Sequence, residues 1–181
     1  MAIKKRDHIF LELGSGAKKG NGEWVTLDRI GACDIWHDLS KGIPFGDNSI
    51  ERIYSSHLFE HFNSEAGLKL LKECMRVLKD GGEFSIAVPD ASLYIRAYVN
   101  NTHIGWSMYN FDQMNVDSPM EYVKYAAYCH GQHFNMFDID SLCAFMKKGG
   151  FSDVSPRLFD PQIDMEERKC ESIYARGIAK K

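Results

Sequence analysis

Short apolar runs alternate with helix-like segments along this chain of 181 residues, and that alternation limits the fold more than any other feature. Several runs stop at glycine, aspartate or histidine, as buried strands do where they meet a turn. The predicted strands cover residues 9–13, 24–27, 34–37, 50–54, 84–88, 154–159 and 172–179. Strands that alternate with helices favour an α/β fold with a mostly parallel sheet, in which Pro156 suits an edge strand.

Three helices are predicted between these strands. The clearest follows the fourth strand, where Ser64 is a suitable cap, Gly81-Gly82 ends the pattern, and apolar residues recur at helical spacing at Leu68, Leu71, Met75 and Leu78. The stretch Ser118-Pro119-Met120-Glu121 is typical of a capping box with proline at the first helical position. Asp138 is a suitable cap for a third helix, which ends at residues 147–150.

Length and composition indicate one domain spanning residues 1–181. Residues 91–137, rich in Tyr, Trp, Asn and His, are expected to form an insertion that covers the substrate. A net charge of −3 argues against a dedicated nucleic-acid binder, because neutralising phosphates needs a basic face. No apolar run is long enough to span a bilayer, and the five cysteines form no C-x-x-C pair. We therefore expect a cytoplasmic protein without a membrane or nucleic-acid partner.

The strand ends carry the residues from which a function can be inferred. In an open parallel sheet the ligand lies beyond the carboxyl ends of the strands. Polar or glycine residues occupy those ends at Gly14 to Gly16, Asp28, Asp38, Ser55 to His57 and Asp90. We expect these positions to converge on one crevice.

The link after the first strand decides which nucleotide fits there. A dinucleotide is held by the N-terminus of the first crossover helix, but only "AKKGNGE" separates Gly16 from Trp24. No full helix fits in that length, whereas a nucleoside joined to an amino acid, such as S-adenosylmethionine, needs no such helix. The Asp28 carboxylate has the chemistry to accept two hydrogen bonds from a ribose diol. Glu12 could meet the ammonium group or brace the glycine loop, and Asp38 could accept from the adenine amino group.

Five ordered blocks resemble the class I S-adenosylmethionine-dependent methyltransferases. They are "LELGSG" (11–16), "GEWVTLD" (22–28), "HDLSKGIPFGDNSIERIYSSHLFEHF" (37–62), "LLKECMRVLKDGGEFSIAVPD" (70–90) and "HFNMFDIDSLCAFMKKGGF" (133–151). The resemblance implies a Rossmann-like, mostly parallel seven-stranded sheet, with the first two crossover helices reduced and a helical insertion before the last two strands. Because those helices are short or missing, we expect one sheet face to be thinly covered, by a second subunit or by residues 91–137.

The resemblance also assigns the cofactor-binding residues. It implies that Glu12 and the loop Gly14-Ser15-Gly16 hold the methionine part of S-adenosylmethionine, and that Asp28 holds the ribose. Asp38 and Leu39 are then expected at the adenine. Ser55, Ser56 and His57 are expected to face the sulfonium, which leaves S-adenosylhomocysteine after transfer.

His57, Glu60 and His61 form H-x-x-E-H, a spacing found in one class of zinc peptidase. Both histidines could share one helical face, but a third ligand from a distant helix would be needed, and the sequence offers no obvious acidic helix for it. Packing of His61 beneath the crevice is the simpler interpretation. No metal is therefore predicted from the sequence.

Methyl transfer is a displacement in which the enzyme aligns the acceptor and excludes water. A base is needed only if the acceptor starts protonated, and the candidates are His57, His133 and Asp90, with His130 beside them. Aromatic residues of the insertion could line the acceptor pocket or belong to the core: Tyr94, Trp106, Tyr109 and Tyr125.

The sequence thus predicts a methyltransferase for a small-molecule acceptor such as a saccharide, with homodimerisation as an option. A non-catalytic nucleoside-binding or partner subunit with the same fold is the alternative from another class. A dehydrogenase is the third option, and it should bind NAD instead.

Overall fold

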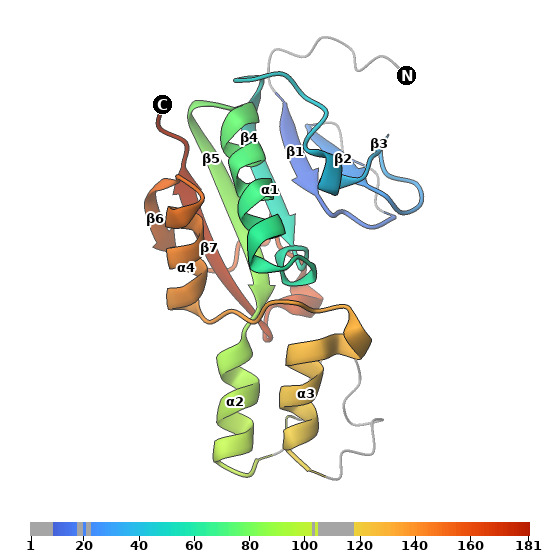
Figure 1. Ribbon diagram of the computed structural model, residues 1–181, viewed down its shortest axis with the longest axis vertical. Coiled ribbons are helices and arrows are strands. Elements are labelled where there is room, and N and C mark those ends of the chain that lie inside the picture. Colours follow the sequence, from blue (N-terminus) through green and yellow to red (C-terminus); the bar gives the residue numbers. More distant parts are fainter. Residues whose placement is uncertain (1–8, 18–19, 21–22, 103, 105–117) are drawn as a thin grey trace.

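A computed structural model describes residues 9–17, 20, 23–102, 104 and 118–181. Seven strands form one sheet in the order β3-β2-β1-β4-β5-β7-β6 (Figure 1). Strand β7 runs antiparallel to the other six, which are parallel to one another. The strands are β1 (Phe10–Leu13), β2 (Trp24–Asp28), β3 (Ile35–Trp36), β4 (Ile50–Ser56), β5 (Leu78–Pro89), β6 (Ser152–Pro156) and β7 (Ser172–Ile178). The predicted mostly parallel α/β sheet is confirmed, and Pro156 does end an edge strand.

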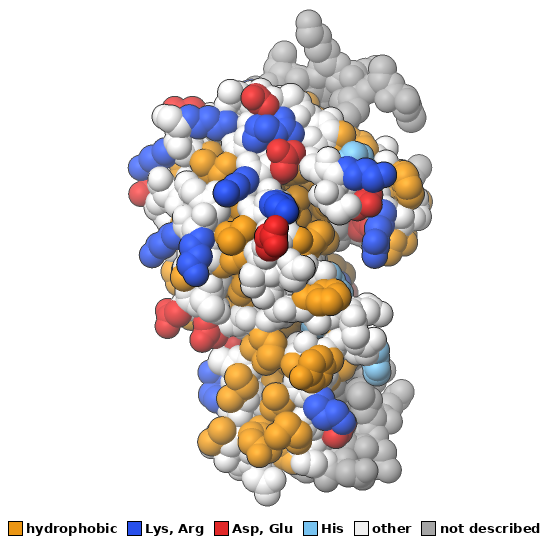
Figure 2. All heavy atoms as spheres, in the orientation of Figure 1, with side chains coloured by type: hydrophobic (Ala, Val, Ile, Leu, Met, Phe, Trp, Pro, Cys, Tyr) orange, Lys and Arg blue, Asp and Glu red, His pale blue; other side chains and the backbone are white. Residues whose placement is uncertain are grey.

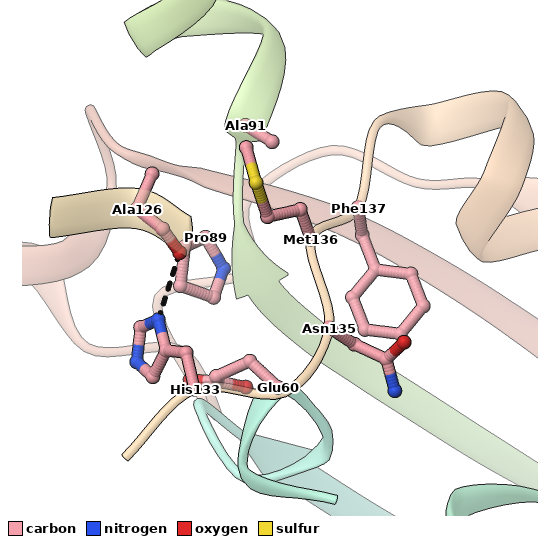
Figure 3. Close-up of a pocket in the computed structure, with 8 residues that line it drawn as sticks. All are labelled: Glu60, Pro89, Ala91, Ala126, His133, Asn135, Met136 and Phe137. Carbon is pink, nitrogen blue, oxygen red and sulfur yellow. Dashed lines mark hydrogen bonds between the residues drawn. The ribbon is translucent and has the colours of Figure 1, made fainter. Parts of the chain in front are cut away.

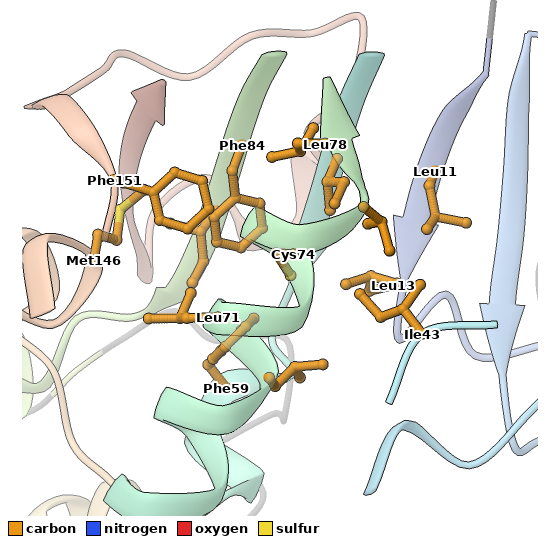
Figure 4. Close-up of a cluster of buried hydrophobic side chains, with 14 of the residues drawn as sticks. Leu11, Leu13, Ile43, Phe59, Leu71, Cys74, Leu78, Phe84, Met146 and Phe151 are labelled. Atoms are coloured by element: carbon orange, nitrogen blue, oxygen red, sulfur yellow. The ribbon is translucent and has the colours of Figure 1, made fainter. Parts of the chain in front are cut away.

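Two helices cover one face of the sheet. Figure 1 shows α1 (Ser64–Val77) and α4 (Ile139–Lys148) side by side in front of the strands. Alternate residues of each strand point to this face, including Leu11 and Leu13 of β1, and they pack on apolar side chains of the helices (Figure 4). Burying one leucine contributes about 2 kcal/mol relative to leaving it exposed, so this layer supplies much of the stability. Fully buried members are Leu11, Leu13, Leu27, Leu71, Leu78, Phe84 and Leu142.

The opposite face of the sheet is more polar. The described links from β1 to β2 and from β2 to β3 contain no helix, as expected from their length. Arg52 and Arg176 are exposed on strands of this face. The segment between β6 and β7 crosses part of it: Asp164 accepts a hydrogen bond of 3.0 Å from the Tyr54 hydroxyl and pairs with the guanidinium of Arg157. The strands therefore present polar side chains on this face, where packing of a helix would require apolar ones.

A second, smaller core lies beyond the end of β5. It joins α2 (Ala91–Val99) to α3 (Met120–Tyr128), with Tyr94 and Tyr125 among its buried residues. Figure 1 places both helices past the carboxyl end of β5 rather than over the polar face. Figure 2 shows apolar side chains gathered over these helices on the face in view. Tyr98 and Val99 of α2 are exposed. Trp106 and Tyr109 lie outside the described residues.

Several predicted boundaries are wrong for local reasons. Asn63, not Ser64, caps α1, since its side chain accepts the Ala66 N–H. The helix ends at Val77, before Gly81, whose positive φ of 77° falls inside β5. No capping box precedes α3: Pro119 occupies the cap position, without a side-chain hydrogen bond there.

The cap of the helix after His133 is predicted correctly. Asp138 and Ser141 form a capping box at the start of α4. The last edge strand lies earlier than predicted, at Ser152–Pro156 rather than 154–159. Among the described residues, no helix has the length and apolar character needed to cross a membrane.

Arg76, near the end of α1, fixes the loop that leads into β4. Its guanidinium donates to the carbonyls of Ile43 and Phe45, both at 2.9 Å, and to the carboxylates of Glu73 and Asp47. The Glu73 carboxylate in turn accepts the Ile43 N–H at 3.0 Å. One forked cation thus satisfies two loop carbonyls that no strand partner reaches.

We predict that Arg76→Ala lowers the free energy of unfolding by about 2 kcal/mol, because it removes the guanidinium donors from Phe45 O and Glu73 and leaves Ile43 O with only the Phe45 N–H among the described residues. Arg76→Lys should recover less than half of that loss, since an ammonium group lacks the planar fork. Lys69→Ala is the control on the same helix: its pair with Glu65 is exposed to solvent, so its loss should change the free energy of unfolding far less. Urea unfolding measures all three, and equal losses for Arg76→Ala and Lys69→Ala would contradict the assignment.

Candidate active site

The glycine loop after β1 is held close to β2 and to the residues after β4. Gly14 donates its N–H to Leu27 O at 2.9 Å, and both Gly14 and Gly16 have positive φ, of 70° and 63°. A Cβ on Gly14 would stand 2.8 Å from Leu58 Cδ1. Glycine is therefore required at this position by conformation and by space.

Asp28 organises the loop from the end of β2. Its Oδ2 accepts the Gly16 N–H at 2.7 Å and its Oδ1 accepts the Ile30 N–H at 3.0 Å. A carboxylate oxygen can accept two hydrogen bonds, so each oxygen keeps one lone pair for a ligand. The half-buried carboxylate is thus oriented by backbone donors while keeping the capacity to bind two hydroxyl groups.

The third strand brings Asp38 to the same edge. His37 donates its N–H to Asp28 O at 2.9 Å, which fixes the chain where β3 ends. Asp38 then caps a short 3₁₀ turn, η1 (Leu39–Lys41); the Ser40 N–H that its side chain accepts holds the pKa of its carboxyl below the ordinary value. The Leu39 side chain points into the main core.

Glu12 and Ser15 complete the set expected around the glycine loop. Glu12 is 7% exposed and lies within β1, one residue before the strand ends at Leu13. Among the described residues, the Ser15 hydroxyl makes a single long contact of 3.5 Å, to Gly16 O. The structure therefore brings the glycine loop, Asp28 and Asp38 together at the adjoining ends of β1, β2 and β3.

The end of β4 lies directly beside the glycine loop, because Ser55 pairs in register with Leu13. The Ser55 hydroxyl is fully buried and makes no hydrogen bond within the described residues. The Ser56 hydroxyl accepts a hydrogen bond of 3.1 Å from Arg168. Neighbouring side chains of a strand point to opposite faces, so these two serine hydroxyls lie on opposite faces of the sheet.

His57 lies deep in the protein, with a side chain only 4% exposed. Its backbone has a positive φ of 50°, uncommon for a residue with a Cβ, and its N–H binds Ala87 O. The ring Nε2 lies 2.8 Å from Ser172 Oγ. Burial, followed by the charge of Arg168, lowers the pKa of His57 well below its ordinary value, so the imidazole is neutral at pH 7.

A buried polar cluster surrounds that imidazole. Glu60 Oε1 lies 3.9 Å from His57 Nδ1, and burial, more than the nearby charge of Glu171, raises the pKa of Glu60 to about 8. Arg168 contributes a cation beside both carboxyl groups. Glu171, which is 1% exposed, accepts a hydrogen bond of 3.3 Å from the Tyr94 hydroxyl.

Sequence analysis missed Arg168 and Glu171 because they stand in a polar stretch, "EERKCE", that has the composition of a surface turn. The stretch contains the 3₁₀ turn η4 (Glu166–Arg168), which carries both residues back beneath the ends of β4 and β5. Only the pairing of β5 with β7 brings this segment there. No local pattern in the sequence could have indicated it.

The other two candidate bases have structural partners. The Asp90 side chain caps α2 by accepting the Ser92 N–H and lies 3.4 Å from Arg96. His133 is half-buried, and its Nδ1 lies 3.0 Å from Ala126 O. Burial lowers the pKa of His133 as well.

A small cavity of about 10 Å³, room for roughly one water molecule, lies between β5, α3 and the segment before α4. Figure 3 shows Glu60 and His133 on one side of it, with Met136 and Phe137 across from them. Its lining also includes Pro89, where β5 ends. The cavity thus lies on the β5 side of the strand ends, while the glycine loop and Asp28 lie on the β1 and β2 side.

A family model described as a methyltransferase domain matches residues 7–155. No curated protein matches the chain. Among solved structures, a protein of Thermotoga maritima described as a possible histamine N-methyltransferase aligns over 97% of this chain and 84% of its own, with 16% identity and a TM-score of 0.58.

Two further structures have the same fold. The YcgJ protein of Bacillus subtilis covers 96% of this chain and 92% of its own, at 13% identity and a TM-score of 0.56. Phosphoethanolamine N-methyltransferase 2 of Haemonchus contortus, solved with S-adenosyl-L-methionine, covers 96% of this chain and 49% of its own, at 13% identity and a TM-score of 0.57. At these identities the likeness shows the fold alone.

The buried Glu171 carboxyl predicts a pH-dependent stability. Burial raises its pKa above the ordinary value of 4.5, so the folded state holds the proton more tightly than the unfolded state does. Its contribution is complete below pH 4.5 and is lost as the pH rises through the folded-state pKa. Glu171→Gln should therefore make the decline in unfolding free energy from about pH 4.5 to 7 shallower than in the wild type.

Urea unfolding across that pH range measures the difference, and Glu166→Gln, at an exposed carboxylate paired with Lys169, is the control. Parallel pH profiles for the wild type and Glu171→Gln would show that this carboxyl is solvated in the folded protein.

Proposed function

Since this chain belongs to the class I S-adenosylmethionine-dependent methyltransferases, we propose that it transfers a methyl group to a small-molecule acceptor such as a saccharide. The observation that carries the proposal is the meeting of the glycine loop and Asp28 at the adjoining ends of β1 and β2. That edge is where an open parallel sheet binds its ligand. The acceptor class rests on the modest size of residues 91–137 and on the absence of a strongly basic composition.

The residues at this edge fit the donor. Asp28 retains one free acceptor position on each oxygen, which matches a ribose diol. Gly16 adopts a positive φ, and no atom of the described residues lies within 4 Å of the place where a Cβ would stand, so this part of the loop leaves room for a ligand against its backbone. The bound donor supplies a methyl group activated by positively charged sulfur. The Asp38 side chain is proposed to lie near the adenine, and Glu12 near the amino acid part.

Residues 91–137 are proposed to cover the acceptor. Their described helices, α2 and α3, stand at the end of β5 with a hydrophobic core of their own, and so form a rigid wall beside the strand ends. The side chains of Met136 and Phe137 give the adjacent cavity an apolar side that excludes water from the reacting groups. A second subunit at the polar sheet face remains a prediction.

His57 is proposed as the group that accepts a proton when the acceptor carries one. Its imidazole is neutral at pH 7 and so can act as a base, while Ser172 at Nε2 fixes the ring. His133 and Asp90 are the reserve candidates, although each already has a structural partner. The deep burial of His57 also favours the alternative, a subunit that binds the nucleoside without catalysis.

We predict that S-adenosylhomocysteine raises the melting temperature by several degrees and that NAD does not. Ligand at about 100 times its dissociation constant adds roughly 2.7 kcal/mol of stability, which is readily measured for a domain of this size. Asp28→Asn should reduce the shift strongly, because an amide cannot accept on both sides.

Asp34→Asn is the matched control, since the Asp34 carboxylate also holds backbone N–H groups, at Gly20 and Thr26, but lies outside the proposed ribose site. Each shift is measured from the variant's own melting temperature without ligand. An undiminished shift in Asp28→Asn would remove that residue from the ribose site, and a shift with NAD alone would favour a dehydrogenase.

For catalysis, we predict that His57→Ala lowers turnover by about 10² or more while S-adenosylhomocysteine affinity changes little. Turnover is measured as S-adenosylhomocysteine released with hydroxylated and amine acceptors on which the wild type is active. Equal turnover in the variant would assign this imidazole to packing. No release by the wild type with any hydroxylated or amine acceptor offered, despite a clear melting shift, would favour the non-catalytic alternative.

A further inference from the structure

Three side chains near the cavity form a cluster, of which the methyl-transfer proposal names only His133, as a reserve base. Glu60 and His61 belong to the 3₁₀ turn η2 (Phe59–His61), and His133 follows a second short turn, η3 (Cys129–Gly131), more than seventy residues later. The two segments are joined because Glu60 O accepts the N–H groups of Phe134 and Asn135. One potential ligand atom from each side chain of the cluster lies within 4.8 Å of the others.

Both histidines are oriented in the same way. His61 Nδ1 lies 3.0 Å from Gln132 O, and His133 Nδ1 lies 3.0 Å from Ala126 O. A carbonyl can only accept, so in each ring Nδ1 carries the proton and Nε2 keeps a free lone pair. A ring N–H held by a carbonyl is the arrangement that orients metal-binding histidines.

Glu60 supplies the third ligand, as a carboxylate once the ion has displaced its proton. Its side chain is 3% exposed, and its Oε2 makes no hydrogen bond with the part of the chain that the structure describes. An unpaired buried carboxyl oxygen is costly, and a cation at the cluster would satisfy it. Figure 3 shows this side chain next to His133 at the cavity, while His61, 37% exposed, gives an ion access from solvent.

From this geometry we propose that Glu60, His61 and His133 bind a divalent first-row transition metal, with Zn²⁺ as the best match. Two imidazole nitrogens and one carboxylate suit zinc and its neighbours, whereas Mg²⁺ and Ca²⁺ prefer oxygen ligands alone. Ligand atoms around tetrahedral zinc stand roughly 3.3 Å apart, so atoms that now lie up to 4.8 Å from one another need to approach by at most about 1.5 Å. Glu60 Oε1 and His61 Nε2, now 4.0 Å apart, are close to that spacing.

The fourth position belongs to water, because His57, whose Nδ1 lies 3.9 Å from Glu60 Oε1, is already proposed as the base. The sequence alone could not complete this site, because the H-x-x-E-H spacing lacked a ligand from elsewhere. His133 supplies it from a turn rather than from a helix. The proposed metal site does not depend on binding of the methyl donor, so a failed metal-binding test would leave the proposed function unaffected.

The test uses the full chain, reduced and stripped of metal with EDTA. Equilibrium dialysis should show one Zn²⁺ bound per chain, Co²⁺ should give the intense visible absorption of a four-coordinate ion, and Zn²⁺ but not Mg²⁺ should raise the melting temperature. His61→Ala and His133→Ala should each weaken Zn²⁺ binding at least about 10-fold. His130→Ala is the control, since that ring packs beside Tyr125 outside the cluster and its loss should leave the affinity unchanged.

Melting of each metal-free variant checks that it folds, and His61→Gln is the substitute if His61→Ala does not. The proposal is overturned if Zn²⁺ binds the wild type and both cluster variants equally, since the ion would then be held by other groups such as cysteine thiols. It is overturned equally if the folded wild type takes up no Zn²⁺ in dialysis.

Discussion

Parallel pairing of β1 with both β2 and β4 is the constraint on which the rest of the site depends. It aligns Leu13 with Leu27 on one side and with Ser55 on the other, so all three strands end at one edge. The glycine loop then has only a short distance to cross before its N–H groups meet Leu27 O and the Asp28 carboxylate. These two hydrogen bonds therefore fix the conformation of the loop and orient the carboxylate, although no crossover helix follows β1 among the described residues.

The loss of the first two crossover helices is tolerated because the uncovered face does not depend on apolar burial. Helices α1 and α4 pack on the opposite side, where the largest apolar cluster lies. On the polar side, the segment between β6 and β7 satisfies the buried strand groups through Arg157 and Asp164. The same segment places Arg168 and Glu171 beneath the strand ends. It therefore covers part of the polar face and also forms one side of the proposed site.

Periodicity predicted the order and type of the strands and of α1, α3 and α4, because each buries a face that its own sequence encodes, but it missed α2. It misplaced ends where single contacts decide them, as with the Asn63 cap and the glycine inside β5. The meeting of the glycine loop with Asp28 was predictable, since the ends of parallel strands converge by geometry alone. The cluster of Glu60, His61 and His133 was not, because two short turns distant in sequence meet only in the folded chain.

A crystal structure of the wild-type protein grown with S-adenosylhomocysteine tests the central claim most directly. The account predicts the adenosyl group across the ends of β1 and β2, with both ribose hydroxyl groups hydrogen-bonded to the carboxylate that already holds the Gly16 and Ile30 N–H groups. A ligand bound elsewhere, or a saturating soak that leaves that edge empty, would contradict it.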